Sequence, residues 1–118
     1  MKHEQRLRTP AEFRRVRDQA PRGWPTRLLV LYVAPNEVGR ARVGITVSSR
    51  VGNAVVRNRV RRRLREALRA RLDRLAAGQD ILVVARAASA EATWPELSSA
   101  LDAALQRAGA THATGASV

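Results

Sequence analysis

The feature that most constrains the fold of this chain is a run of arginines superimposed on a helical hydrophobic pattern between residues 50 and 71. The run contains nine Arg and a single acidic residue, Glu66. Within it and just beyond it, apolar residues recur every three or four positions, as on the buried face of a helix. These residues are Val56, Val60, Leu64, Ala67, Leu68, Leu72 and Leu75. We therefore expect one long helix, with Asn53 as its N-cap and Gly78 near its C-terminal end.

The polar half of this predicted helix carries Asn58, Arg61, Arg62, Arg65 and Arg69. Arginines with so few acidic partners at helical spacing repel one another, at a cost of roughly a few tenths of a kcal/mol per pair. Phosphates stabilise an array of guanidinium groups, so the pattern predicts contact with a nucleic acid. The amide of Asn58 fits either a contact to base edges or sugar hydroxyls, or a simple exposed position.

The overall composition agrees with a polyanionic partner. The 118 residues carry 22 Lys and Arg against 10 Asp and Glu, which gives a formal net charge of +12. The chain has no Cys, which excludes disulfides, thiolate zinc sites and cysteine nucleophiles. No apolar run approaches the roughly 18 residues that span a membrane, and charged residues begin the chain where a signal peptide would be apolar. We therefore expect a cytoplasmic protein with no membrane partner.

Residues suited to catalysis are sparse. His3 and His112 lie near the chain ends, outside the predicted elements, and the carboxylates are scattered without a pair spaced for acid–base work or metal binding. The glycine-rich phosphate loop of nucleotide-binding enzymes does not occur. We therefore expect no catalytic residue and no metal site in the polypeptide itself, and a role in binding.

The rest of the pattern predicts two further helices and three strands. Thr9-Pro10-Ala11-Glu12 has the form of a helix start, and a helix to about residue 18 should follow. Apolar runs predict strands at 28–34, 42–47 and 81–85, the first two joined as an antiparallel hairpin. Thr93-Trp94-Pro95-Glu96 opens a last helix.

This order of elements favours an α+β sandwich with helices against a small sheet. We expect one domain over residues 1–107 and a flexible tail over 108–118. The strand–helix–strand unit between residues 43 and 85 should join parallel strands, and the general rule makes such a crossover right-handed.

The most specific motif of the chain is Arg57-Asn58-Arg59-Val60-Arg61-Arg62-Arg63-Leu64-Arg65-Glu66, preceded by Gly52-Asn53-Ala54-Val55. This motif resembles the signature of the bacterial ribonuclease P protein subunits. Residues 42–48 and 80–86 are similar to strands of that family, and Leu7, Phe13 and Val16 match its N-terminal region. The resemblance extends from about residue 7 to residue 106.

The resemblance implies both a fold and an activity. The family forms a small two-layer α+β sandwich, of a kind shared with a ribosomal protein domain, with a left-handed βαβ crossover that departs from the general rule. Its members are accessory subunits of a ribonucleoprotein endonuclease that removes the 5′ leader from precursor tRNA. There the RNA subunit and its bound Mg²⁺ carry out the hydrolysis. The implied partners are the catalytic RNA and precursor tRNA, with no obligatory protein partner.

The resemblance also implies which residues meet these partners. The single-stranded leader would lie in a cleft between the N-terminal helix and the sheet, against Phe13, Arg17 and Tyr32. Arg17 stands where many family members have an aromatic residue. Judged by residue type alone, Phe13 and Tyr32 fit either core packing or a stacking platform for unpaired bases. The residues implied to face the catalytic RNA are Arg50, Arg57, Asn58, Arg59, Arg61, Arg62 and Arg65.

The sequence is also compatible with two other classes of protein. A small basic ribosomal protein of similar fold would use the arginine helix for a purely structural contact with ribosomal RNA. A DNA-binding regulator would place the helix in a major groove, although no second helix directly precedes it as a helix-turn-helix requires.

Overall fold

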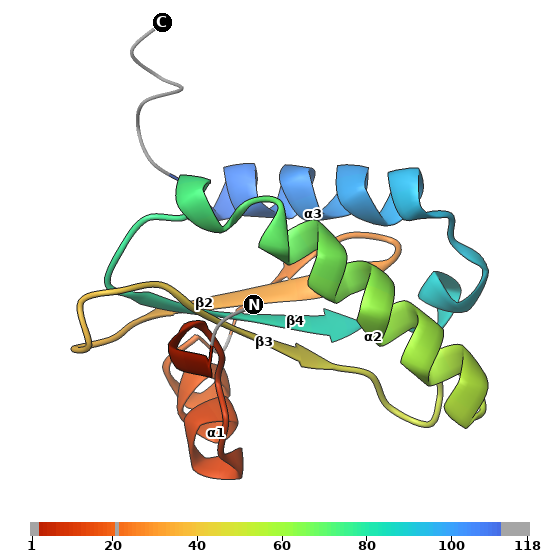
Figure 1. The fold of residues 1–118 in the computed structure, drawn as a ribbon, viewed down its shortest axis with the longest axis horizontal. Coiled ribbons are helices and arrows are strands. Elements are labelled where there is room, and N and C mark those ends of the chain that lie inside the picture. Colours follow the sequence, from red (N-terminus) through yellow and green to blue (C-terminus); the bar gives the residue numbers. More distant parts are fainter. Residues whose placement is uncertain (1–2, 21, 112–118) are drawn as a thin grey trace, which may run out of the picture.

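The computed structural model describes residues 3–20 and 22–111, which form a four-stranded sheet with helices on both faces. Helices α2 and α3 cover one face together, and α1 lies against the other (Figure 1). This arrangement confirms the predicted α+β sandwich. The helices are α1 (Pro10–Gln19), α2 (Ala54–Arg69) and α3 (Trp94–Ala108), with 3₁₀ turns η1 (His3–Gln5), η2 (Leu72–Arg74) and η3 (Ala87–Glu91). The strands are β1 (Trp24–Pro25), β2 (Leu29–Pro35), β3 (Arg42–Thr46) and β4 (Gln79–Ala85).

Strand β4 lies between β2 and β3 in the sheet order β1-β2-β4-β3. It pairs antiparallel with β2 along its whole length and parallel with β3 along residues 80–84. The predicted hairpin between the strands at 28–34 and 42–47 is therefore wrong, because the corresponding strands β2 and β3 are not neighbours. Residues 80–83 are all buried, and an apolar strand covered on both faces suits the interior of a sheet rather than its edge.

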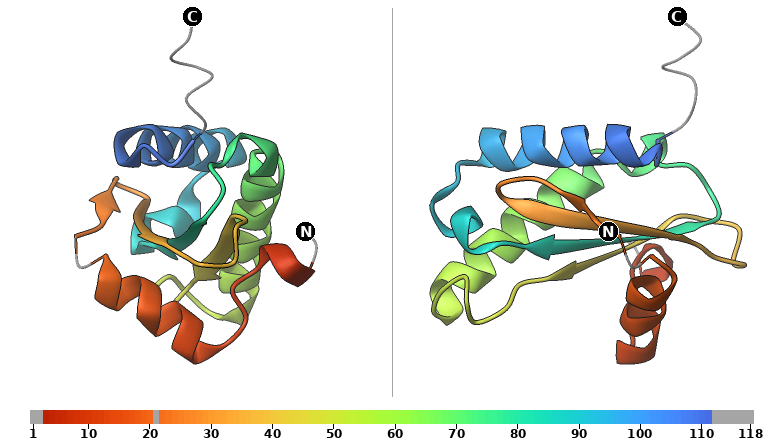
Figure 2. Two further views of the ribbon diagram at one scale, coloured as in Figure 1. Left: turned by 90° about the vertical axis from the view of Figure 1, so that its left-hand side faces the viewer. Right: turned by 180° about the vertical axis from the view of Figure 1, so that it is seen from behind.

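The β3–α2–β4 crossover is left-handed. When β3 and β4 point up and α2 faces the viewer, β4 lies to the left of β3 (Figures 1 and 2). The same strand order would be right-handed if α2 crossed the opposite face, but that face carries α1. The general rule of handedness thus fails here, and the expectation that came from the family resemblance is confirmed.

The alternating side chains of β4 divide the apolar residues into two clusters of unequal size. Ile81, Val83 and Ala85 face α2 and α3 and belong to the main core. Leu82 faces α1 and packs with Val16 in a much smaller cluster on the other side. Because α1 contributes few apolar contacts, its position on the sheet requires additional interactions.

Helix α2 ends at Arg69, roughly two turns before the predicted end near Gly78. The side chain of Arg71 turns inward and is only 6% exposed. Its Nη1 donates to the carbonyl oxygen of Ala67 at 2.7 Å and so caps one of the last carbonyls of the helix. Its Nε donates to Oδ1 of Asp102 on α3 at 2.6 Å. The chain then continues through η2, and the long apolar stripe is completed by this turn rather than by helix.

The folded part of the chain extends past the predicted domain end at residue 107. Ala108 is the last residue of α3, and Gly109 caps the helix with a φ of 65°. Ala110 is fully buried, and its carbonyl oxygen accepts hydrogen bonds from the backbone N–H of Ala76 and from Nε2 of Gln79. The prediction of a flexible tail is therefore wrong for residues 108–111. The rest of that tail, 112–118, lies outside the described residues.

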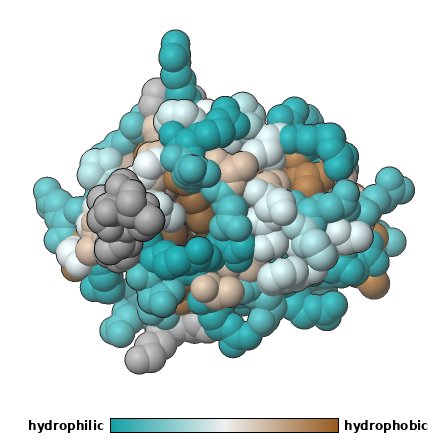
Figure 3. Space-filling view, turned by 90° about the horizontal axis from the view of Figure 1, so that it is seen from above, coloured by the Kyte–Doolittle hydropathy of each residue, from teal (hydrophilic) through white to brown (hydrophobic). Residues whose placement is uncertain are grey.

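The surface over α2 and α3 is mainly hydrophilic, and its hydrophobic areas are separate patches (Figure 3). Within the described part of the chain, no helix is long and apolar enough to cross a membrane.

Candidate nucleic-acid interface

The arginines of α2 lie on three sides of the helix, which the buried residues Val60 and Leu64 orient against the sheet. One flank carries Arg57, Arg61 and Arg65, spaced four residues apart and therefore stacked in a row along the helix. Arg61 and Arg65 line a hollow of about 320 Å³ beside the outer edge of β3. The other residues around this hollow are Arg6, Leu7, Arg8, Phe13, Val43, Gly44 and Ile45.

The floor of this hollow exists because residue 44 has no side chain. A Cβ at Gly44 would lie 2.8 Å from Cε2 of Phe13 and 2.9 Å from Cδ1 of Leu7. The ring of Phe13 therefore packs directly onto the backbone of β3 and is half-buried. Phe13, implied as a leader contact, thus shares one hollow with Arg61 and Arg65, which were implied to face the catalytic RNA.

The opposite flank of α2 is bonded to the rest of the protein. Nη2 of Arg59 donates to the carbonyl oxygen of Ala90 at 3.0 Å, and Nη1 of Arg63 donates to that of Ala92 at 2.7 Å. These bonds connect α2 to η3 and to the residue that directly follows it. Arg59, which is expected to meet RNA, thus also bonds within the fold, and the structural role of Arg63 was not foreseen.

The outer side of α2 is more exposed. Asn58 accepts a hydrogen bond from Nη1 of Arg61 at 2.8 Å, so its amide orients a neighbouring guanidinium. Arg62 is exposed, as is Arg50 before the helix. Arg69 differs, because its Nη2 pairs with Glu66 at 2.6 Å on the helix surface. Positive charge available to a partner is therefore concentrated on the outer side and on the flank beside β3.

On the α1 face of the sheet, Arg17 and Tyr32 lie together. The Cζ atom of Arg17 is 4.4 Å from the centroid of the Tyr32 ring, a cation–π geometry. Tyr32 is half-buried on β2, whereas Arg17 is exposed one turn after Phe13 on α1. The structure therefore brings together all three residues implied for leader contact on one side of α1.

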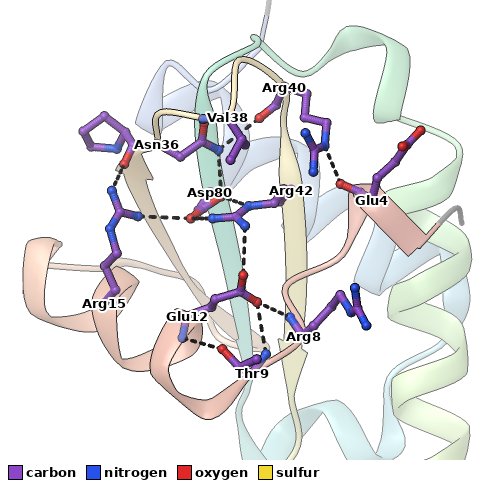
Figure 4. A network of polar contacts seen from close by, with 11 residues as sticks. Glu4, Arg8, Thr9, Glu12, Arg15, Asn36, Val38, Arg40, Arg42 and Asp80 are labelled. Carbon is purple, nitrogen blue, oxygen red and sulfur yellow. Dashed lines mark hydrogen bonds and ion pairs between the residues drawn. The ribbon is translucent and has the colours of Figure 1, made fainter.

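A buried carboxylate connects α1 to the sheet (Figure 4). Asp80 on β4 is completely buried and accepts two hydrogen bonds from Arg42, of 2.8 and 2.9 Å. It also accepts one from Arg15 of α1 at 3.2 Å and one from Asn36 at 2.7 Å. Arg42 reaches Glu12 of α1 as well, at 2.9 Å. Charged residues are rarely fully buried unless paired, so an acidic residue directly before the apolar run 81–85 was the sequence signal for this network.

The network also changes the ionisation of its members. The backbone N–H groups of Arg8 and Thr9 donate to Glu12 and, with the Arg42 guanidinium nearby, hold the pKa of Glu12 below its ordinary value. The hydrogen bonds to Asp80 raise the pKa of Arg42 further. Glu12 therefore stays ionised at the first turn of α1, where it completes a capping box with Thr9.

Over residues 3–20 and 22–111, no three His, Cys, Asp or Glu side chains gather in a group that could hold a metal ion. The implication that Mg²⁺ is bound mainly by an RNA subunit stays a prediction.

Comparisons with known proteins show the family to which this chain is similar. The family model described as Ribonuclease P matches residues 1–109. The ribonuclease P protein component of Roseiflexus castenholzii is 46% identical over 110 residues, covering 92% of this chain and 89% of the relative. That of Herpetosiphon aurantiacus is 43% identical over 112 residues, covering 95% and 90%. The structure of Staphylococcus aureus RNase P protein matches with a TM-score of 0.83 at 29% identity, covering 92% of this chain and 98% of that one.

A small α+β sandwich with an arginine-lined hollow beside its longest helix has the architecture of a protein component of a ribonucleoprotein. The similarities extend over almost the whole chain and almost the whole of each relative. The chain belongs to the ribonuclease P protein family, whose members are components of a tRNA-processing ribonuclease. This membership confirms the family resemblance and favours it over the ribosomal and DNA-binding alternatives.

Proposed function

We propose that this chain binds the catalytic RNA of ribonuclease P through α2 and receives the 5′ leader of precursor tRNA in the cleft beside α1. The observation that carries the proposal is that the arginines on the two flanks of α2 differ in their bonding partners. On the flank beside β3, Arg57, Arg61 and Arg65 have no carboxylate partner among the described residues. On the opposite flank, the guanidinium groups are bonded to carbonyl oxygens of the fold.

The hollow beside β3 has the chemistry that RNA requires. Four arginines at positions 6, 8, 61 and 65 surround it, and its floor is formed by Phe13 and the backbone at Gly44. Guanidinium groups bind phosphates with charge-assisted hydrogen bonds, and an aromatic floor accepts the face of an unpaired base. A strand of RNA that passes from α2 toward α1 would meet both features in succession.

In this proposal the RNA subunit and the Mg²⁺ bound to it carry out the hydrolysis. The protein contributes positive charge against two polyanions, which strengthens the association of substrate with the catalytic RNA and broadens the range of substrates. Precursor tRNA is the substrate, and no other protein is required.

The first experiment is a cleavage assay on precursor tRNA at low Mg²⁺, with the catalytic RNA alone, the protein alone and both together. Cleavage at the mature 5′ end that requires both is the expected result. If the protein does not stimulate the RNA, the proposal fails. Cleavage by the protein alone would reveal an active site in the polypeptide and would overturn the assignment of hydrolysis to the RNA.

A pair of charge-matched variants tests the RNA contact itself. Replacing Arg61 and Arg65 with Gln should flatten the slope of log affinity for the catalytic RNA against log salt by about 1.5–2, if each residue meets one phosphate. Replacing Arg27 and Arg74, which are exposed elsewhere, removes the same charge and should leave the slope nearly unchanged. Equal effects of the two pairs would contradict a local contact at α2.

A further inference from the structure

The edge of the sheet at β1 carries an exposed aromatic side chain, that of Trp24, which is 37% exposed. Trp24 lies directly opposite Leu31 of β2. Opposed residues of an antiparallel pair project from the same face of a sheet, and Leu31 belongs to the main core under α2 and α3. The Trp24 ring therefore lies on the α3 side of the sheet, away from α1 and the proposed leader cleft.

Two arginines from other elements reach this edge. Cζ of Arg107, near the end of α3, is 5.9 Å from the centroid of the Trp24 ring, and its Nη1 donates to the carbonyl oxygen of Pro25 at 2.8 Å. Nη1 of Arg86, directly after β4, donates to the carbonyl oxygen of Thr26 at 3.0 Å. Because a guanidinium has five N–H donors, one bond to a carbonyl holds it in place and leaves other donors for a ligand.

The arginines at this edge keep their positive charge. Arg22, just before β1, is exposed, as are Arg86 and Arg107. Within residues 3–20 and 22–111, none of these three pairs with a carboxylate. Arg27, in the turn after β1, differs because its Nη2 lies 3.9 Å from Oε2 of Glu96. Three positive charges without a counter-charge thus accompany one partly exposed aromatic ring.

This edge is separate from the basic flank of α2. Strands β1 and β3 are the two outer strands of the sheet, and the hollow at Arg61 and Arg65 lies beside β3. Three strand spacings of about 4.8 Å place the two edges roughly 14 Å apart. The left view of Figure 2 shows β1, in orange, on the opposite side of the sheet from α2, in green. A ligand bound at one edge therefore does not occupy the other.

We propose that the β1 edge is a second RNA-binding surface, which takes an unpaired RNA segment with a base against Trp24 and phosphates against the three arginines around it. Proteins bind single strands without sequence preference by combining an aromatic stacking platform with positive charge along the backbone. A duplex offers no free base face to the ring. The inference goes beyond the proposed function, which uses the opposite edge and the α1 face. With both surfaces occupied, one protein holds two RNA segments at once.

The chain has two tryptophans, so fluorescence gives a local test. Trp94→Phe leaves Trp24 as the only one. This variant is combined with the catalytic RNA and a precursor tRNA and then titrated with an oligouridylate of about ten nucleotides. The fluorescence of Trp24 should be quenched by the oligonucleotide, and a duplex of the same length should not quench it. If the catalytic RNA supplies the unpaired segment, quenching appears when that RNA is added and the oligonucleotide adds nothing.

The reverse variant is the control for this readout. Trp24→Phe leaves Trp94, which begins α3 and lies about 20 Å along the helix from Arg107. The fluorescence of Trp94 should not respond to the oligonucleotide.

The second readout is the affinity for whichever RNA quenches Trp24. Trp24→Ala should weaken it by roughly 5-fold or more, and Trp24→Phe by less, because the aromatic ring is kept. Arg22→Gln and Arg107→Gln should each flatten the slope of log affinity against log salt by about 0.7. Arg74→Gln removes the same charge from an exposed position in η2 and should leave the slope nearly unchanged. Thermal unfolding verifies that each variant is folded.

The inference is overturned if neither RNA quenches Trp24, if the duplex quenches it equally, or if Arg22→Gln and Arg74→Gln have the same salt slope. Arg22 makes this last comparison independent of the fold, because no hydrogen bond or ion pair joins it to the rest of the described chain. A protein that does not stimulate cleavage would refute the proposed function alone. The oligonucleotide can then be titrated onto the free protein, and Trp24 still reports on the β1 edge.

Discussion

Arg42 and Asp80 lie directly opposite each other on the neighbouring parallel strands β3 and β4 and form a two-pronged ion pair. Nε and Nη2 of Arg42 donate to the two carboxylate oxygens of Asp80 at 2.8 and 2.9 Å. Through Glu12 and Arg15, the same pair reaches α1 at two points. The helix that forms one wall of the proposed leader cleft is therefore positioned by buried charge as much as by apolar packing.

Asp80→Asn should destabilise the protein by about 3–5 kcal/mol, because it leaves the Arg42 guanidinium without its main counter-charge in a largely buried place. The measurement is the denaturant midpoint of unfolding. Asp73→Asn is the control, since Asp73 is exposed, and it should change stability by no more than about 0.5 kcal/mol. Similar midpoints for the two variants would show that the buried network contributes little.

Arg71→Met and Arg69→Met remove the same charge from the end of α2 and should differ sharply in stability. Arg71 is buried and bonded to Ala67 and Asp102, so its loss should cost about 2–4 kcal/mol. Arg69 pairs with Glu66 in solvent and should contribute less than about 1 kcal/mol. Thermal unfolding of the two variants side by side measures the difference, and a comparable loss in both would contradict the structural role of Arg71.

Gly44→Ala should destabilise the protein by about 1–3 kcal/mol, because the added methyl group overlaps the Phe13 ring and the Leu7 side chain, which pack on β3. The clash falls on Phe13 and Leu7, so the same variant should also weaken affinity for the catalytic RNA. A second change, Phe13→Leu, removes part of the clashing ring and should recover some of the stability. Full stability of Gly44→Ala alone would show that Phe13 does not pack tightly on the strand.

The stability that Glu12 contributes should be lost in acid. Its pKa is lowered in the folded protein by the N–H groups of Arg8 and Thr9. The contribution is therefore complete above its unfolded pKa of about 4.3 and disappears as the pH falls through the lower folded value. The difference in unfolding free energy between the wild type and Glu12→Gln should thus shrink as the pH falls below about 4. A difference that stays constant between neutral pH and pH 3 would contradict this prediction.

Local signals in the sequence predicted the helix starts accurately. Thr9 and Thr93 form the expected capping boxes, and Asn53 caps α2. These features depend on residues at most three positions apart, so they are readable without any knowledge of the fold. The end of α2 was misjudged because it depends on Arg71 reaching Asp102, which is 31 residues away.

In the candidate site, too, some features could be predicted from the sequence and others depend on tertiary contacts. Its composition was evident from the run of arginines, but in sequence those arginines look equivalent. Tertiary contacts bond Arg59 to the carbonyl oxygen of Ala90 and Arg63 to that of Ala92, which lie 31 and 29 positions away along the chain. Other contacts bring Phe13 onto Gly44 and place Arg17 over Tyr32.

The sequence by itself determined the starts of the three helices, three of the four strands, the buried side of each helix, the basic character of the chain and the family. It could do so because periodicity, capping and charge are properties of neighbouring residues. Only the tertiary structure decided the strand order, because β4 pairs with two strands that lie far from it along the chain. It also shows the hand of the crossover, which for that strand order depends on which face of the sheet α2 crosses. It also decided which arginines stay available to RNA. A guanidinium is available or engaged according to the carbonyls and carboxylates that the fold brings to it, and those partners lie far away along the chain.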